Sequence, residues 1–170
     1  MTDELTIRDM REDERDDVRA VTLAAYEEYA KLMPPTIWER YREASLQTLD
    51  DIGAAECIVA ERQGSLVGSV LLYPASVRAY GSLAGEALYP EVRLLAVIPA
   101  ARGLKIGKAL MHECEQRARR SGADAIGLHT MDIMQTAIKM YEQMGYVRAP
   151  EMDFTPAPNL VVKGYRRTLV

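Results

Sequence analysis

The sequence predicts an α/β fold in which one mixed β-sheet carries helices on both faces. Its 170 residues fit a single domain that is large enough to bury its own core. The expected elements follow in the order β-α-α-β-β-β-α-β-α-β-β without a repeat or a linker, which favours one sheet covered by helices. Hydrophobic residues make up 48% of the chain and charged residues 27%. This composition excludes a disordered tail, a collagen-like fibre and a coiled coil.

The N-terminal part is expected to form a short strand, Leu5–Arg8, followed by two helices. Residues 11–31 have the spacing of an amphipathic helix, with apolar side chains at Val18, Val21, Leu23, Ala25 and Tyr26. Met33-Pro34-Pro35 ends this helix, and Thr36 can cap a second helix that runs to about Leu49. The apolar side of the second helix would carry Ile37, Tyr41, Ala44 and Leu46.

The middle of the chain is rich in residues that favour strands. Cys57–Glu61 and Leu66–Tyr73 are predicted strands, and the four residues Arg62-Gln63-Gly64-Ser65 between them predict a hairpin. Pro74–Pro90 has the composition of a loop. Val92–Ile98 is a dense apolar run that ends at a proline, so it is expected to be a buried strand.

The C-terminal part begins with a strongly amphipathic helix over Ile106–Arg120, and Gly122 can end it in a left-handed conformation. Its apolar face would carry Ile106, Ala109, Leu110, Cys114 and Ala118. The next elements are a strand, a helix that Gly145 stops, and two late strands. Their expected ranges are Ala125–Thr130, Gln135–Met144, Val147–Arg148 and Val161–Leu169.

Charge and cysteine content limit the possible partners and compartments. The net charge of −4 is unfavourable for a general nucleic-acid binder. The charge is uneven, because residues 1–50 carry 13 acidic and 7 basic side chains whereas residues 91–170 carry 8 and 12. This asymmetry fits a solvated acidic helix, or a C-terminal half that binds an anion and an N-terminal half that binds a cation. Two cysteines cannot build a disulfide framework, so we expect a reducing, cytoplasmic setting.

Several common kinds of site are missing from the sequence. The charged first 20 residues are not expected to be a signal peptide, and no transmembrane segment is expected because no apolar run is long enough to span a membrane. The glycine-rich dinucleotide motif, the P-loop and the serine nucleophile elbow are absent. His112 and His129 lack metal-ligand spacing, so no metal site is expected. His112 is expected at the surface or its boundary, His129 in a structural role at a strand end, and Cys114 in the core.

One segment has the composition of an anion site. It runs from the Val92–Ile98 strand through a basic turn into the Ile106–Arg120 helix, with Arg102, Lys105 and Lys108 close together. The first N–H groups of a helix lack internal partners and carry the positive end of its dipole, so they favour phosphate. Glycines in the turn allow a close approach of the backbone. An ordinary strand–helix junction with exposed basic residues is the alternative.

Two motifs resemble those of the GNAT acetyltransferase superfamily. The turn resembles motif A, (Q/R)-x-x-G-x-(G/A), through Arg102 and Gly107, with Lys105 where the family usually has glycine. Residues 137–146 resemble the A-x-x-x-Y-E-x-x-G-(F/Y) signature of motif B, with Met134 where an asparagine often precedes it. The two motifs follow in the family's element order. The resemblance covers the whole chain, residues 1–170, as a single acetyltransferase domain.

The resemblance implies transfer of an acetyl group from acetyl-CoA to an amine. In the family the fourth and fifth strands splay apart and pantetheine lies between them, which here implies Val92–Ile98 and Ala125–Thr130. Backbone groups near Leu95, Ala96 and Val97 would bond pantetheine and polarise the thioester carbonyl. The pyrophosphate would be held by the turn, which consists of Arg102, Gly103, Leu104, Lys105, Ile106, Gly107 and Lys108.

The reaction needs a proton acceptor and a proton donor. An alkyl amine has a pKa of about 10.4 and is mostly protonated at neutral pH, so it must lose a proton before it attacks. Glu91 stands where some family members carry a general base, although it could also be a surface carboxylate or leave the task to a water chain. Tyr141 matches the family's general acid for the departing thiolate. A core tyrosine without chemistry is the alternative at that position.

The acceptor is not fixed by the sequence. The resemblance implies that it is shaped by residues 26–35 and by the Pro74–Pro90 loop, with Tyr26, Glu27, Tyr29 and Tyr80 as candidate contacts. Carboxylates and aromatic rings suit a cationic amine, so a small-molecule or peptide amine is expected, with no nucleic acid or membrane partner and with a homodimer possible. A non-catalytic acyl-CoA sensor on the same fold, and an enzyme that prefers longer acyl groups, remain alternatives.

Overall fold

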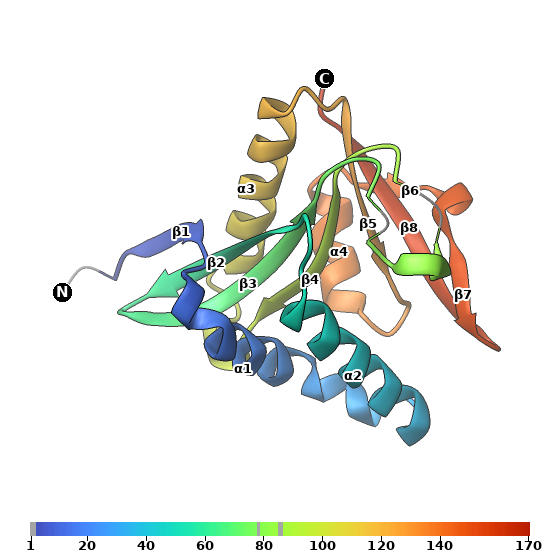
Figure 1. Cartoon of the computed structure of the whole chain (residues 1–170), viewed down its shortest axis with the longest axis horizontal. Coiled ribbons are helices and arrows are strands. Elements are labelled where there is room, and N and C mark those ends of the chain that lie inside the picture. The colour runs from blue at the N-terminus through green and yellow to red at the C-terminus, as the bar shows by residue number, and fades with distance from the viewer. Residues whose placement is uncertain (1–2, 78, 85–86) are drawn as a thin grey trace. The chain divides into compact units, whose positions relative to one another are not determined.

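A computed structural model describes residues 3–77, 79–84 and 87–170 (Figure 1). Residues 78, 85 and 86 of the predicted loop lie outside this part of the chain. The chain forms two compact units: unit 1 is Met1–Leu71 with Leu94–Glu113, and unit 2 is Leu72–Arg93 with Cys114–Val170. The single-domain organisation stays a prediction.

The strands of unit 1 follow the hydrogen-bonded order β1-β2-β3-β4, and the first three lie side by side in Figure 1. Their bounds are Leu5–Asp9 for β1, Glu56–Arg62 for β2, Ser65–Tyr73 for β3 and Glu91–Val97 for β4. β1 pairs antiparallel with β2, from Leu5 opposite Arg62 to Asp9 opposite Ile58. Gln63 (φ +53°) and Gly64 (φ +77°) are both left-handed. Two left-handed residues make a turn whose twist suits a hairpin, which confirms the predicted turn.

The predicted helix over residues 11–31 is three shorter elements. A 3-10 turn, η1 (Glu12–Glu14), leads into α1 (Arg15–Tyr26), and a second 3-10 turn, η2 (Glu27–Lys31), follows it. A continuous α-helix was therefore the wrong prediction. The acidic pair at the start of η2 provides a physical reason, because negative side chains are unfavourable at the carbonyl end of a helix. The second predicted helix is α2 (Pro35–Asp50).

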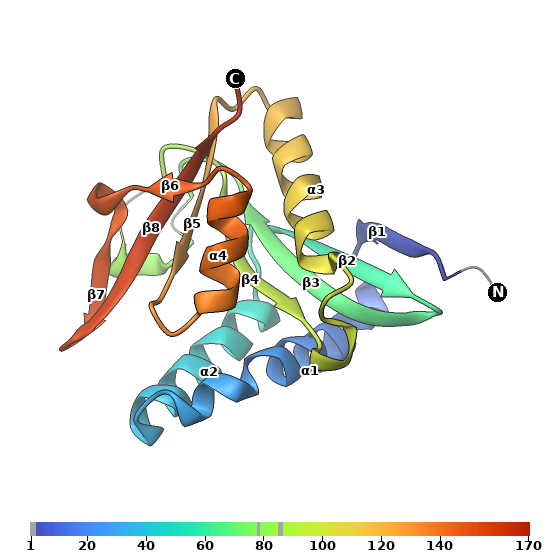
Figure 2. The same cartoon turned by 180° about the vertical axis from the view of Figure 1, so that it is seen from behind.

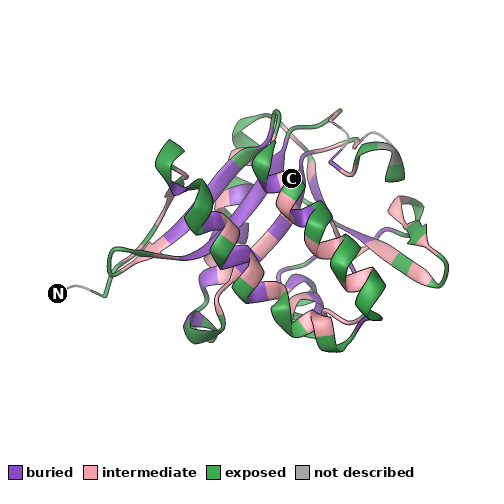
Figure 3. Cartoon of the chain, turned by 60° about the horizontal axis from the view of Figure 1, so that its bottom comes forward, coloured by how far each residue is buried: buried purple, intermediate pink, exposed green. Residues whose placement is uncertain are grey.

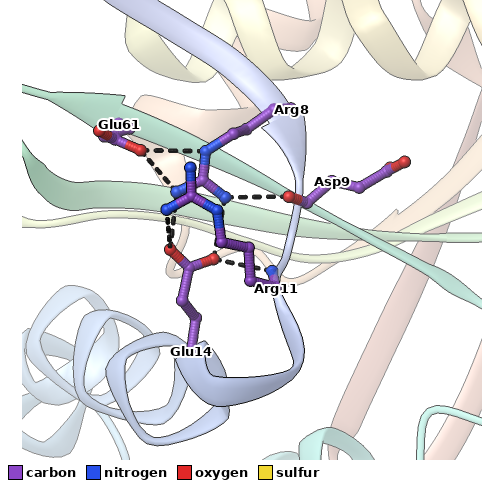
Figure 4. A network of polar contacts seen from close by, with 5 residues as sticks. All are labelled: Arg8, Asp9, Arg11, Glu14 and Glu61. Carbon is purple, nitrogen blue, oxygen red and sulfur yellow. Dashed lines mark hydrogen bonds and ion pairs between the residues drawn. The ribbon is translucent and has the colours of Figure 1, made fainter.

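The entry to α1 is held to the sheet by a network of charged groups (Figure 4). Arg8 on β1 donates to both oxygens of Glu14, at 2.9 and 2.6 Å, and to Glu61 on β2 at 3.0 and 2.5 Å. The backbone N–H of Arg11 also donates to Glu14 at 2.8 Å. The Arg8 guanidinium lowers the pKa of the Glu14 carboxyl to about 2. Glu14 is therefore ionised at neutral pH and binds η1 to β1, and Arg8 extends the network to β2 through Glu61.

Burial follows the strands and one face of each helix (Figure 3). In unit 1, Val21 and Ala25 on α1 pack with Ala96 on β4. The buried residues of α2 are Ser45 and Leu49, whereas Ala44 is exposed. The predicted apolar side of α2 was therefore displaced by about one residue. α3 (Ile106–Arg120) buries Ile106, Leu110, Cys114 and Ala118 as predicted.

The unit boundary falls inside β4, so its first three residues belong to unit 2, where the strand order is β4-β5-β8-β6 and β7 pairs with β8 (Figure 2). The new elements are β5 (Ala125–Thr130), α4 (Gln135–Gln143), β6 (Val147–Arg148), β7 (Phe154–Ala157) and β8 (Leu160–Thr168), with 3-10 turns η3 (Gly81–Leu83) and η5 (Pro150–Met152). β7 was not predicted from the sequence. It is four residues long, and Pro156 lacks the N–H of a regular strand residue, so the segment does not resemble a strand in sequence.

The sheet is mixed, as predicted. β5, β6 and β7 pair antiparallel with β8, whereas β4 and β5 run parallel. The described ladder between β4 and β5 has two pairs, Glu91–Gly127 and Val92–Leu128, at the start of β4. Such a short ladder is what the expected splay requires. Among the described residues, no helix is long and apolar enough to span a membrane.

Candidate functional site

The predicted phosphate-binding turn joins η4 (Pro99–Ala101) to α3. Gly103 (φ +80°) and Lys105 (φ +61°) are left-handed. The N–H of Ala109 donates to the carbonyl of Lys105 at 3.0 Å. Because this is the first bond of the helix, the N–H groups of Ile106, Gly107 and Lys108 precede it and have no partner within the helix. The turn is thus exposed and ends in N–H donors beside cationic side chains.

Arg102 holds this turn to the end of α1. Its Nη1 contacts Glu28 Oε2 on η2 at 2.7 Å, and its Nη2 donates to the carbonyl of Ala25 at 3.0 Å. The Arg102 and Glu28 side chains are 39% and 48% exposed. An ion pair in that much solvent is weak. Arg102, which motif A predicts as a cofactor contact, therefore has two protein partners of its own.

The predicted pantetheine strand is kinked within unit 1. Leu94, just before Leu95, Ala96 and Val97, has φ +55°, an uncommon backbone conformation for a residue with a side chain. The Tyr26 hydroxyl donates to the carbonyl of Leu95 at 2.6 Å. The last residue of α1 is therefore bonded to the backbone of β4.

The predicted acceptor contacts of unit 1 lie around an aromatic cluster. The Tyr26 ring lies 5.8 Å from that of Tyr29 and 6.1 Å from that of Tyr41 on α2, and the Trp38 ring lies 6.3 Å from Tyr41. These four rings are half-buried, and Glu27 is exposed. The cluster thus offers apolar surface beside a carboxylate.

Glu91 and His129 form a buried pair in unit 2. Nδ1 of His129 contacts Oε1 of Glu91, and Nε2 lies 2.7 Å from the carbonyl of Met152. The His129 and Glu91 side chains are 4% and 5% exposed. The alternative in which Glu91 is a surface carboxylate is therefore wrong. Burial tends to lower the pKa of His129, but the bond to Glu91, its charge and the Met152 carbonyl outweigh it, so the pKa is raised.

Aromatic rings surround the imidazole of His129. Tyr80, a predicted acceptor contact, lies edge-on to it at 4.8 Å, and Phe154 on β7 lies at 5.1 Å. Arg93 places its guanidinium 4.5 Å from the centre of the Tyr80 ring and donates to the carbonyl of Ala79 at 2.7 Å. Tyr80 is thus packed among these groups within unit 2.

Tyr141 lies in the last turn of α4 and is 6% exposed. Its ring centre is 5.8 Å from that of Tyr146. The Tyr146 hydroxyl donates to Glu115 at 3.4 Å, and Arg167 contacts the same oxygen at 2.5 Å. Burial and then the Glu115 charge raise the pKa of Tyr146, so its hydroxyl stays protonated. The Tyr141 ring thus packs against a tyrosine that is itself held by Glu115. The catalytic role of Tyr141 stays a prediction.

The structure groups the predicted residues unit by unit. Unit 1 holds the turn, the Leu95–Val97 backbone and Tyr26, Glu27 and Tyr29, whereas unit 2 holds Glu91, Tyr80 and Tyr141. The contact between His129 and Glu91 was not predicted, because the two residues are 38 positions apart and no local motif joins them. Among the described residues, no group of His, Cys, Asp and Glu is arranged to hold a metal ion.

Known proteins support the motif resemblance. The acetyltransferase (GNAT) family matches residues 22–146, about three quarters of the chain. An IAA acetyltransferase of Azospirillum brasilense is 32% identical over 102 residues, 59% of this chain and 61% of that protein. An aminoalkylphosphonate N-acetyltransferase of Salmonella typhimurium is 32% identical over 99 residues, 58% of this chain and 60% of that protein. The chain thus spans about three fifths of these relatives' length.

Solved structures show the same fold over nearly all of the chain. A GNAT-family acetyltransferase of Staphylococcus aureus aligns with a TM-score of 0.72 at 17% identity, covering 98% of this chain and 100% of that one. The PaiA N-acetyltransferase of Thermoplasma acidophilum, solved with coenzyme A, aligns with a TM-score of 0.71 at 15% identity, covering 97% and 99%. With the family match over residues 22–146, the chain belongs to the acetyltransferase (GNAT) family.

Proposed function

We propose that the protein is an acetyl-CoA-dependent N-acetyltransferase that acylates a primary amine of a small molecule or peptide by direct attack in a ternary complex. The turn before α3 is the observation that carries this proposal. It offers three N–H groups without helical partners, the exposed Lys105 and Lys108, and an open backbone at Gly103, where an added Cβ would meet no atom within 4 Å. Membership of the GNAT family supports the same cofactor.

The residues of the turn fit a pyrophosphate. Helix N–H donors and two ammonium groups are complementary to its charge, and exposed cations keep the site accessible. The backbone of Leu95, Ala96 and Val97 would hold pantetheine along β4. In this proposal Tyr26, by occupying one lone pair of the Leu95 carbonyl, fixes the direction of that strand. Acetyl-CoA, when bound, supplies a thioester carbon that an amine can attack.

In this proposal Glu91 accepts a proton from the amine and Tyr141 donates a proton to the departing sulfur. A proton leaves the ammonium group of the acceptor toward Glu91, and the amine nitrogen then forms the new C–N bond. As the C–S bond breaks, Tyr141 donates its hydroxyl proton to the sulfur, and the phenolate takes the second proton from nitrogen. The products are an amide and a free thiol, and one proton passes from Glu91 to solvent.

The acceptor is proposed to be a cationic amine that also carries an apolar group. Tyr26 and Tyr29 present half-buried rings, and Glu27 adds a nearby negative charge. Rings and carboxylates attract ammonium groups. The relatives' names add aminoalkylphosphonates to the compounds worth testing. A cytoplasmic setting and a homodimer also stay proposals.

The experiment combines binding and turnover. Acetyl-CoA at 100 times its Kd should stabilise the protein by about 2.7 kcal/mol, and ATP or NAD should not. Thiol release from acetyl-CoA is then followed with 2-aminoethylphosphonate, tryptamine, spermidine and an N-terminal alanine peptide. Binding with thiol release supports the enzyme. Binding without release from any amine would favour the acyl-CoA sensor, and equal stabilisation by ATP would contradict the cofactor assignment.

A further inference from the structure

The contacts of His129 determine how many protons it shares with Glu91. A carbonyl can only accept a hydrogen bond, so Nε2 of His129 must carry a proton toward Met152, 2.7 Å away. Neutral imidazole then has no proton on Nδ1, yet Nδ1 contacts a carboxyl oxygen of Glu91. A second proton must lie between these two atoms, on the ring or on the carboxyl group. The pair therefore holds one shared proton.

We propose that His129 is a positioning residue for Glu91, and that the two side chains accept the proton of the amine as a pair, only after the shared proton has left. This inference rests on the proposed function, in which Glu91 is the proton acceptor. Without the shared proton, the Glu91 carboxylate faces the Nδ1 lone pair of His129 in a buried place. The carboxylate oxygen and Nδ1 can then share an incoming proton, so the pair can act as a base.

The groups around His129 support this assignment. Glu91 on β4 and Asp153, which follows η5, are the negative groups that raise its pKa. Tyr80 and Phe154 cover its ring. Asp153 is itself bound by Arg148 at 2.8 and 2.7 Å, so its charge is partly balanced. Glu91 is therefore the main partner that the charge of His129 can depend on.

The backbone carbonyl that orients His129 is held by close packing. Gly164 on β8 pairs opposite His129. A Cβ on Gly164 would lie 2.3 Å from the Cβ of Met152 and 2.9 Å from the carbonyl of Ala149. Only glycine leaves room for Met152 there. This packing thus keeps the Met152 carbonyl beside Nε2 of His129.

Imidazole NMR tests the pair without any turnover. The chain has two histidines, and the spectrum of a His112→Gln variant assigns their signals. The ring of His129 should stay protonated above pH 6.5 in the wild type, and in Glu91→Gln it should lose its proton at least about one pH unit lower. An unchanged titration in Glu91→Gln would overturn the shared proton.

The pH dependence of kcat tests the consequence for catalysis, with the best amine found by thiol release. His129→Asn keeps an N–H at the Nδ1 position but cannot ionise, so the acid limb of its kcat profile should move at least about one pH unit lower. His129→Gln keeps a donor toward Met152 instead and should lose more of the plateau kcat. The KM for acetyl-CoA should change little in both. Melting temperatures show whether each variant folds.

The outcomes separate the two proposals. The shared-proton pair is supported if the acid limb of the kcat profile moves to lower pH in His129→Asn and the NMR titration of His129 moves to lower pH in Glu91→Gln. Turnover with an unmoved limb overturns the role of His129 and leaves the acetyltransferase standing. A wild type that releases no thiol with any amine overturns the proposed function and this inference with it. If His129→Asn does not fold, the limb of His129→Gln decides in the same way.

Discussion

The turn before α3 and the cluster around His129 handle charge in opposite ways. The turn is exposed and presents backbone N–H groups and lysines to solvent. The His129 cluster is buried, and its charges are bonded to each other. Water and ions screen the first site but hardly reach the second. Salt should therefore control binding at the turn, and proton concentration should control the state of the His129 cluster.

The largest expected effect tests whether Tyr141 in unit 2 takes part in catalysis and not in acetyl-CoA binding. Tyr141→Phe removes one hydroxyl and keeps the ring that packs near Tyr146. We expect kcat to fall by about 10²–10⁴, with little change in acetyl-CoA Kd or Tm. Tyr165→Phe is the matched control, since Tyr165 is also buried, at 5% exposed. Normal kcat in a folded Tyr141→Phe would remove Tyr141 from the mechanism.

The next largest effect is expected from a substitution that disturbs the buried His129 cluster. Gly164→Ala forces Met152 away from β8 and disturbs the carbonyl that binds His129. Overpacking of this kind costs about 1–3 kcal/mol, or roughly 2–12 °C in Tm. Gly53→Ala is the contrasting variant: Gly53 has φ +59° and no atom within 4 Å, so its loss comes from backbone strain, whereas Gly164 is not left-handed and its loss comes from crowding. An unchanged melting temperature in Gly164→Ala would mean that crowding at Gly164 is unimportant.

A smaller effect is expected from a charge reversal at the exposed turn before α3. Lys108→Glu reverses a charge in the first turn of α3 without disturbing the contacts that Arg102 makes. A loss of about 1–2 kcal/mol corresponds to roughly 5- to 30-fold weaker acetyl-CoA binding. The loss should shrink as salt is raised. Calorimetry on Arg40→Glu, an exposed position of α2, serves as control. The same Kd in all three proteins would place the phosphates elsewhere.

The smallest effect sharpens the description of the turn. Lys105 has φ +61°, where a side chain is strained and glycine is not. Lys105→Gly should raise stability by up to about 1 kcal/mol, or roughly 2–4 °C in Tm. Lys105→Ala loses the same charge and keeps the strain, so it should show no such gain in thermal unfolding. A destabilised Lys105→Gly would show that the lysine side chain stabilises the turn.

The difference between the two regions also explains what could be read from the sequence. The turn and α3 are made by consecutive residues, so the spacing of Arg102, Gly107 and the apolar face predicts them. Glu91 and His129 meet only because Glu91 pairs with Gly127 across two parallel strands. That register depends on the whole sheet, and no local pattern encodes it. Glu91 was therefore found as a candidate, but its burial and its partner were not.

Smaller misses have the same kind of cause. The break between α1 and η2 is invisible to hydrophobic spacing, which continues through Tyr26. β7 is a short strand with Pro156, and only its pairing with β8 makes it a strand. The left-handed Leu94 in β4 could not be predicted from the sequence, since leucine has no preference for that conformation.

The bond from Tyr26 to the Leu95 carbonyl bears on attempts to alter the amine specificity of the proposed acetyltransferase. Exchanging residues 26–35 for the equivalent segment of another acetyltransferase would be a natural experiment in redesign. Any such graft that lacks the Tyr26 hydroxyl also frees a carbonyl of β4, 69 residues away in sequence. A graft should therefore begin at Glu27. A graft without the Tyr26 hydroxyl, although intended to change the proposed amine specificity, would also disturb the strand proposed to hold acetyl-CoA.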